Sequence, residues 1–303
     1  MGDAGLASLA GALQRGALPR LQALKLQCNV FSATGCAALG ICMGRGALGG
    51  LKQLCMNDNT LGDAETFWAA MRPGVMANLV QLYWYSTGMG DAGLAAFARA
   101  ISNGALPALR DLFLQENAFG DEGMEVHHPS KPPNPSLLSF PLRAARANRL
   151  PTTRLATPAT PSPAPHRLST LWPCCHAQLP SHPTATPQQA LSLALGRHAL
   201  PSLGCLRLES NRFGDRGLGA LALALRSGGL RSLRVLFLSG SDFGAAGCGA
   251  LTTALRIAAR DPAVGGGVLP CLCNLEVPAG HARDWQLRAA CDALGVQLQG
   301  GMI

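Results

Sequence analysis

The sequence predicts an α/β solenoid, in which a short β-strand and an α-helix alternate along a repeat of about 28 to 30 residues. Two recurring blocks support this prediction: a strand block found seven times, and a helix block rich in glycine and alanine that follows it. A third observation is a proline-rich segment that interrupts one of the intervals between strand blocks. Together these features predict one repeating domain with a foreign segment inside it.

The strand block has the pattern L-x-x-L-x-x-L-x-L-x-x-N, and its central L-x-L has a period of two. That period is typical of a short strand that buries one face. In one block Trp84 takes the place of the second leucine of L-x-L, so we expect it to be buried. The block starts at Leu18, Leu48, Met76, Leu106, Leu200, Leu230 and Leu269.

The asparagine that ends the block suits a buried amide ladder, in which side-chain amides satisfy the backbone groups of the loops. Four blocks have it, as Asn29, Asn59, Asn117 and Asn211. Where another residue replaces it we expect a weaker ladder, at Thr87, Ser241 and Gly280.

The helix block begins with Gly-Asp, as in GDAGLAAFARAI from Gly90. Its apolar residues recur at i, i+3, i+4 and i+7 and predict one buried helical stripe, formed here by Leu94, Phe97, Ala98 and Ile101. The aspartate stands where an N-cap would be, so we expect it to accept hydrogen bonds from the first amides of its helix. These aspartates are Asp3, Asp91, Asp121 and Asp215.

The repeat length and both blocks resemble the long leucine-rich repeat of ribonuclease inhibitor, of Ran GTPase-activating proteins and of the sensor domains of NOD-like receptors. The resemblance covers residues 2 to 125 and 190 to about 298. It implies a curved horseshoe with a parallel sheet on the inside and helices on the outside. It does not imply one function, because one repeat type serves many functions.

Two intervals between strand blocks exceed the unit, with 94 residues after Leu106 and 39 after Leu230. A Gly-rich stretch at 259–268 provides a loop that can hold the extra residues of the 39-residue interval. The longer excess includes residues 127–189, which hold 14 of the 21 prolines and none of the 36 glycines, so we expect disorder there. The chain therefore divides into N-terminal repeats at 1–125, a disordered insertion at 126–189 and C-terminal repeats at 190–303.

Removing residues 126–189 joins GDEGME to ALSLALGRHALPSL, and the product aligns with two other repeats over 20 positions without a gap. The removed segment begins with Val126, whose codons start with GT, and ends with Gln189, which CAG can encode. Those are the ends of a spliceosomal intron. One hypothesis is therefore a retained intron, and the other is a genuine disordered insertion in a surface loop.

The middle side chain of each L-x-L points away from the core, so equivalent positions should form rows along the inside of the horseshoe. The rows hold both tyrosines of the chain, beside smaller residues such as Cys55, Asn57 and Ser239. Aromatic residues flanked by arginine and glutamate are typical of interface cores, whereas the alternative is that β-propensity and shielding of the sheet explain them. The predicted partner-binding residues are Tyr83, Tyr85, Phe113, Gln115, Arg207, Glu209 and Phe237.

The sequence offers no candidate catalytic, cofactor-binding or metal-binding residue. Five of the seven histidines lie in the proline-rich segment, which gives them no rigid support. Cys174, Cys175 and His176 are adjacent there but lack a second ligand pair at zinc-finger spacing. P-loop, G-x-S-x-G and H-E-x-x-H motifs are missing. We therefore expect a protein that is not an enzyme and needs no cofactor.

The net charge of +8 does not indicate a nucleic-acid partner, because residues 127–189 contain six basic and no acidic residues, leaving +8 − 6 = +2 for the rest. The eleven cysteines are scattered and odd in number, as expected of reduced thiols. Neither a secretory leader nor an apolar run of membrane-spanning length is present. We expect a soluble, cytoplasmic protein that binds neither nucleic acid nor membranes.

The predicted function is a non-catalytic scaffold that binds a protein partner on the concave face. The resemblance leaves two alternatives. One is a GTPase-activating protein of the Ran-specific type, although no catalytic residue can be matched to that family. The other is a sensor fragment of a NOD-like receptor, whose P-loop ATPase module this chain lacks.

Overall fold

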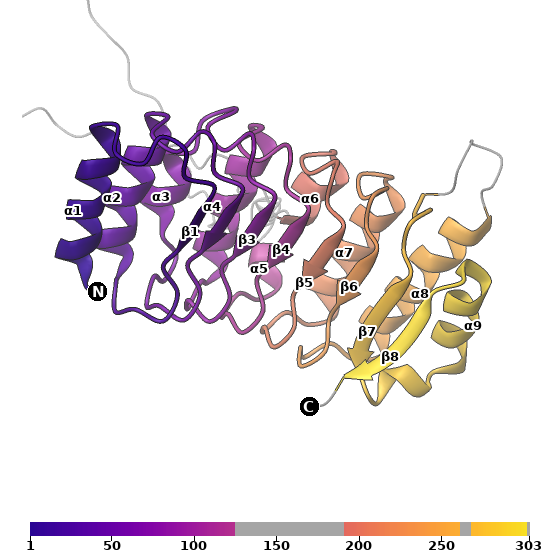
Figure 1. Ribbon diagram of the computed structural model, residues 1–303. Helices are drawn as coiled ribbons and strands as arrows, with labels where there is room; N and C mark the ends of the chain where they lie inside the picture. The colour runs from indigo at the N-terminus through magenta and orange to yellow at the C-terminus, as the bar shows by residue number, and fades with distance from the viewer. Residues whose placement is uncertain (125–190, 261–267, 302–303) are drawn as a thin grey trace, which may run out of the picture. The chain divides into compact units, whose positions relative to one another are not determined.

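The computed structural model describes residues 1–124, 191–260 and 268–301, which lie in one compact unit. Eight parallel strands form a single sheet in chain order, and the helices form a second layer along one side of it (Figure 1). The predicted α/β class, with a parallel sheet and a helical layer, is confirmed. The insertion predicted at 126–189 and most of the Gly-rich stretch at 259–268 lie outside the described residues.

The elements alternate as the repeat predicts. The strands are β1 (Ala23–Lys25), β2 (Gln53–Cys55), β3 (Gln81–Tyr83), β4 (Asp111–Phe113), β5 (Cys205–Arg207), β6 (Val235–Phe237), β7 (Asn274–Pro278) and β8 (Gln297–Gly301). The helices are α1 (Asp3–Gln14), α2 (Ala33–Gly44), α3 (Glu65–Ala69), α4 (Asp91–Ser102), α5 (Asp121–Met124), α6 (Leu191–Gly196), α7 (Asp215–Arg226), α8 (Ala245–Arg260), the 3-10 helix η2 (His281–Arg283) and α9 (Trp285–Leu294).

The sheet register follows the L-x-L motif. The first leucine of each motif pairs with its equivalent in the next strand, from Leu24 with Leu54 through to Leu236 with Leu275. All seven predicted strands are present. The eighth strand, β8, was not predicted, because only Val296 and Leu298 there match the spacing of the strand block.

The core is a set of apolar side chains between the sheet and the helices. The predicted stripe of α4 is confirmed, since Leu94, Phe97, Ala98 and Ile101 are fully buried. Trp84 is also fully buried, and its ring centroid lies 4.6 Å from that of Trp68 in α3. These large rings occupy the space beside a helix of only five residues.

The asparagine ladder is confirmed. The Asn117 amide group donates to the carbonyls of Trp84 and Leu114, and its Oδ1 accepts from the Thr87 backbone amide at 3.1 Å. Thr87 still takes part, because its hydroxyl donates to the Trp84 carbonyl. Ser241 does not, since its buried hydroxyl has no partner among the described groups. The ladder is therefore weaker at Ser241, as expected.

The expected role of the Gly-Asp aspartates is wrong. Gly90 and Gly214 are the N-caps of α4 and α7, and the aspartate after each is the first helical residue. From that position the carboxylate contacts the start of the helix in the next repeat. Asp91 Oδ1 accepts from the backbone amides of Gly120 and Gly123, at 2.7 and 2.9 Å.

This contact recurs and explains the second glycine of the G-D-x-G block. Asp121 bridges in the same way to Gly214 and Gly217, and Asp215 to Gly244 and Gly247. A Cβ on Gly217 would lie 2.7 Å from Asp121 Oδ1, so only glycine admits the carboxylate. We call this series of contacts the aspartate ladder.

The repeat that ends at Met124 and the repeat that begins at Leu191 are neighbours in the sheet. Strands β4 and β5 pair in the common register, and the Asn117 backbone amide donates to Asn211 Oδ1 at 3.1 Å. Helices α5 and α6 each pack against both α4 and α7, so the two short helices share one place in the helical layer. They contain four and six residues, against twelve in α4 and in α7. The repeats on either side therefore stack as neighbours, in agreement with the gapless alignment that removal of residues 126–189 produces.

Candidate functional site

The predicted partner-binding residues lie on the sheet face that is turned away from the helices. Tyr83, Phe113, Arg207 and Phe237 are consecutive register partners on β3 to β6, and we call them the aromatic–arginine row. All four side chains are half-buried, whereas the leucines beside them in sequence are fully buried. Tyr85, Gln115 and Glu209 are also half-buried and lie two residues after the ends of β3, β4 and β5.

Side chains of the aromatic–arginine row stack on one another across the strands. The Tyr83 and Phe113 rings are nearly parallel, with an interplanar angle of 5° and centroids 4.3 Å apart. The Arg207 guanidinium lies 4.7 Å from the Phe237 centroid and 6.0 Å from the Phe113 centroid. Cation–π attraction therefore continues the aromatic stack over four strands.

A second contact holds Arg207 in place. Its Nε donates to Glu209 Oε1 at 2.9 Å, and the Arg207 and Glu209 side chains are 35% and 12% exposed. Burial raises the pKa of Glu209 above its ordinary value, although Arg207 opposes the shift. Within the described residues, Glu209 Oε2 and Gln115 Oε1 are buried and have no hydrogen-bond partner. The row thus borders two acceptor atoms that no donor satisfies.

The two tyrosines are also perturbed by their surroundings. Burial raises the pKa of both Tyr83 and Tyr85, and the neighbouring acidic and thiol groups raise it further. Both phenols are therefore neutral at physiological pH, when they can donate hydrogen bonds.

Three smaller residues that were expected in the exposed rows are buried. Cys55, Asn57 and Ser239 are only 6%, 4% and 6% exposed. Their register is as predicted, but short side chains beside larger neighbours do not reach solvent. Asn57 donates to Asp58, and Ser239 donates to Glu276. The predicted surface is therefore interrupted at Cys55 and Asn57, near β2, and at Ser239, after β6.

Sequence reasoning missed a charged arrangement at the strand ends. Lys52, Arg110 and Arg234 precede β2, β4 and β6 at equivalent positions, and all three are exposed. A cleft of about 650 Å³ lies between Arg110 and Arg234, with Gly204 at the equivalent position before β5. The sequence does contain a signal for this arrangement, which is a basic residue before alternate L-x-L motifs. It lies outside the motif, at a position that varies between repeats.

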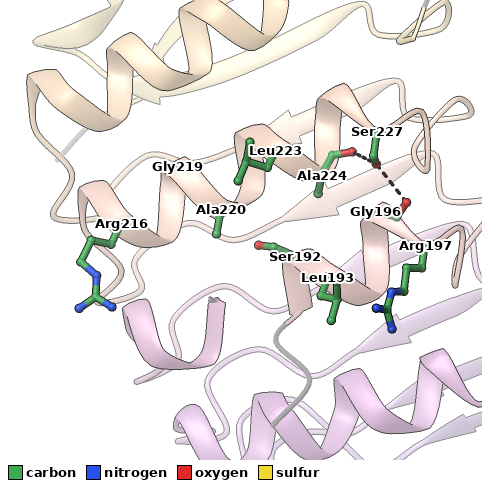
Figure 2. Close-up of a pocket in the computed structure, with 10 residues that line it drawn as sticks. All are labelled: Ser192, Leu193, Gly196, Arg197, Arg216, Gly219, Ala220, Leu223, Ala224 and Ser227. Atoms are coloured by element: carbon green, nitrogen blue, oxygen red, sulfur yellow. Dashed lines mark hydrogen bonds between the residues drawn. The ribbon is translucent and has the colours of Figure 1, made fainter. Parts of the chain in front are cut away.

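A second hollow lies on the helical layer, between α6 and α7 (Figure 2). It has a volume of about 750 Å³ and is lined mainly by small and apolar side chains, among them Leu223, which is 63% exposed. Ser227 closes one end, where its Oγ lies within hydrogen-bonding distance of the Ala224 carbonyl, at 2.7 Å, and of the Gly196 carbonyl, at 3.0 Å. Because it borders the undescribed part of the chain and gathers no cluster of titratable groups, we do not take it as the functional site.

No group of three or more His, Cys, Asp or Glu side chains that could hold a metal ion occurs in the described part of the chain. In those same ranges, no helix combines the length and the apolar character needed to cross a membrane.

A repeating strand–helix unit, a parallel sheet and an open sheet face define an α/β solenoid repeat protein. A family model described as a leucine-rich repeat matches residues 199–222, a stretch that contains β5 and the first two turns of α7. This match supports a leucine-rich-repeat protein, and such a repeat suggests a scaffold for protein interactions. No curated protein was found to match the chain.

Proposed function

We propose that the protein is a non-catalytic scaffold that binds a protein partner on its sheet face, at Tyr83, Tyr85, Phe113, Gln115, Arg207, Glu209 and Phe237. The observation that carries the proposal is the aromatic–arginine row, in which stacking and one ion pair hold four side chains in fixed positions. In this proposal the repeat is of the ribonuclease-inhibitor-like type, and the sheet face is its concave side.

Fixed side chains favour binding for an entropic reason. A partner that meets a preformed row does not have to immobilise it, so less of the interaction energy is lost on association. Aromatic and arginine side chains are also the ones that dominate the energetics of protein interfaces. The row combines both properties on neighbouring strands.

A cytoplasmic location is part of this proposal. Each of the nine cysteines in the described part of the chain is free, including the exposed Cys28, Cys271 and Cys273. Free exposed thiols suit a reducing compartment. Two alternatives are a Ran-type GTPase activator and a fragment of a NOD-like receptor. No specific observation in the described residues supports either of them.

The test is a binding measurement on partners identified by cross-linking. Phe113→Ala should weaken binding by about 1 to 4 kcal/mol and leave the fold intact, because the side chain stands on the open face. Leu223→Ala, an exposed position on the helical layer, is the matched control and should leave the affinity unchanged. Equal affinities of wild type and Phe113→Ala for every partner would contradict the proposal.

A further inference from the structure

We infer that the cleft between Arg110 and Arg234 is an anion-binding site, and that it takes a carboxylate from an acidic and aromatic segment of the protein partner. This inference rests on the proposed function and names the chemistry of the partner. The anion site is carried by the cleft and its charges, whereas the aromatic part of the segment rests on the aromatic–arginine row.

The backbone fixes the positions of the two arginines. The Gly204 amide donates to the Arg110 carbonyl at 2.8 Å, and the Arg234 amide donates to the Gly204 carbonyl at 2.7 Å. The three residues are therefore consecutive in the sheet. At a strand spacing of about 4.8 Å, the backbones of Arg110 and Arg234 lie roughly 10 Å apart. Both side chains are exposed and can converge on one group between them.

Glycine leaves the space between the arginines open. A Cβ on Gly204 would lie 3.7 Å from the nearest atom, the Arg110 carbonyl oxygen, so the position is not closed by packing. The cleft is also lined by Ser202 and Ser232, and the Ser232 hydroxyl donates to the Pro201 carbonyl. A planar carboxylate that enters here meets two guanidinium groups, the best donors for bidentate pairing.

The carboxylates in and near the cleft favour a short acidic segment over a polyanion. Asp111 lines the cleft itself, and Glu209 and Glu116 lie shortly after the ends of β5 and β4. A nucleic acid crossing this face would place phosphates against these carboxylates, which repel it. A peptide with a carboxylate in the cleft can instead place an aromatic residue against Phe113 and Phe237.

The experiment measures binding of three labelled peptides by fluorescence anisotropy, with alternating Glu–Phe, Gln–Phe or Lys–Phe sequences, and of a short oligothymidylate. The Glu–Phe peptide should bind best, and its affinity should fall with added salt. The double variant Arg110→Gln/Arg234→Gln should raise its dissociation constant about tenfold or more. Gly204→Met, which fills the cleft and keeps both arginines, should have a similar effect.

The control is Arg226→Gln/Arg256→Gln, which removes the same charge from exposed positions on α7 and α8. Equal losses in both double variants would overturn the site, because net charge alone would then explain them. Tighter binding of the oligothymidylate, with loss in the cleft variants, would overturn the choice of a carboxylate. If no peptide binds while Phe113→Ala still weakens binding of a cross-linked partner, the cleft inference fails and the proposed function stands.

Discussion

Leu112 and Phe113 are neighbours in β4, yet their side chains lie on opposite faces of the sheet. Leu112 is fully buried between sheet and helices, whereas Phe113 is half-buried on the open face. Leu112→Ala should therefore cost about 2 to 5 kcal/mol of stability through the cavity it leaves. Phe113→Ala should lower the free energy of unfolding less than Leu112→Ala does, and it should weaken partner binding more. Chemical denaturation of both variants checks the difference, and equal destabilisation would show that the two faces are not distinct.

The tyrosines allow a direct measurement at the site, because Tyr83 and Tyr85 are the only two in the chain. Since burial raises the pKa of both, phenolate absorbance should appear only above the ordinary value of about 10. As pH rises, the tyrosines of the unfolded chain lose their protons before those of the folded chain. The contribution of the neutral tyrosines to the free energy of unfolding is therefore complete below their pKa in the unfolded chain, and it is lost as pH rises through their pKa in the folded chain. A titration that is identical with and without denaturant would show that the rings are not buried.

At this scale the sequence predicted side-chain direction well. The period of two in L-x-L and of 3.6 in the helix blocks depends only on backbone geometry, so the burial of Leu94 and Trp84 followed from spacing. Contacts between repeats were not accessible in the same way. The role of Asp91 depends on which atoms of the next helix come within reach, and that distance cannot be read from one repeat.

Among the elements, the aspartate ladder couples successive helices. Asp91→Ala removes the acceptor of two first-turn amides and should cost about 1 to 2 kcal/mol of stability. Asp91→Asn keeps an oxygen acceptor and should restore part of that loss. Asp242→Ala, at an exposed position, is the control and should stay within about 0.5 kcal/mol of wild type. Thermal unfolding of the three variants checks the order, and an Asp91→Ala variant as stable as wild type would contradict it.

Helices α5 and α6 lead to a prediction about the chain between them. Deleting residues 126–189 leaves two residues between Met124 and Leu191. The four residues of α5, these two residues and the six of α6 would then form a segment of twelve residues, which is the length of α4. We expect the deletion variant to fold with an equal or higher melting temperature, because a long chain no longer has to be closed into a loop. Loss of cooperative unfolding in this variant would contradict the continuity of the helix.

Transcript sequencing separates the two origins of that segment. Reads that join the codons of Glu125 and Ala190 would support a retained intron, whereas reads that always contain the segment would support a genuine insertion. Both outcomes are compatible with a foldable deletion variant, so the two experiments are independent.

Element prediction worked where the blocks repeat and failed where they do not. Seven strands share one template, which makes each of them evidence for the others. Strand β8 has no such template, and it forms because β7 offers an edge to pair with along five residues. The basic side chains before alternate strands were missed for a related reason, since they vary between repeats.

For the whole described unit, contacts are made almost wholly between neighbouring repeats. The sheet pairs each strand with the next in sequence order, and the asparagine and aspartate ladders do the same for loops and helices. Stability in such arrays is close to a sum of repeat and interface terms. A variant in one repeat should therefore lower the stability of that repeat and its two neighbours most.

The aspartate ladder also gives the array a polarity. Each carboxylate accepts hydrogen bonds from the first amides of the helix in the next repeat, so the two ends of the array are not equivalent. Truncation after a repeat leaves an aspartate facing water, which an ionised carboxylate tolerates at little cost. Truncation before a repeat leaves first-turn amides without their carboxylate acceptor, and the loss of such a helix cap costs about 0.5 to 2 kcal/mol. Fraying should thus be less costly at one end than at the other, and shortening from the C-terminal side should preserve more of the remaining structure.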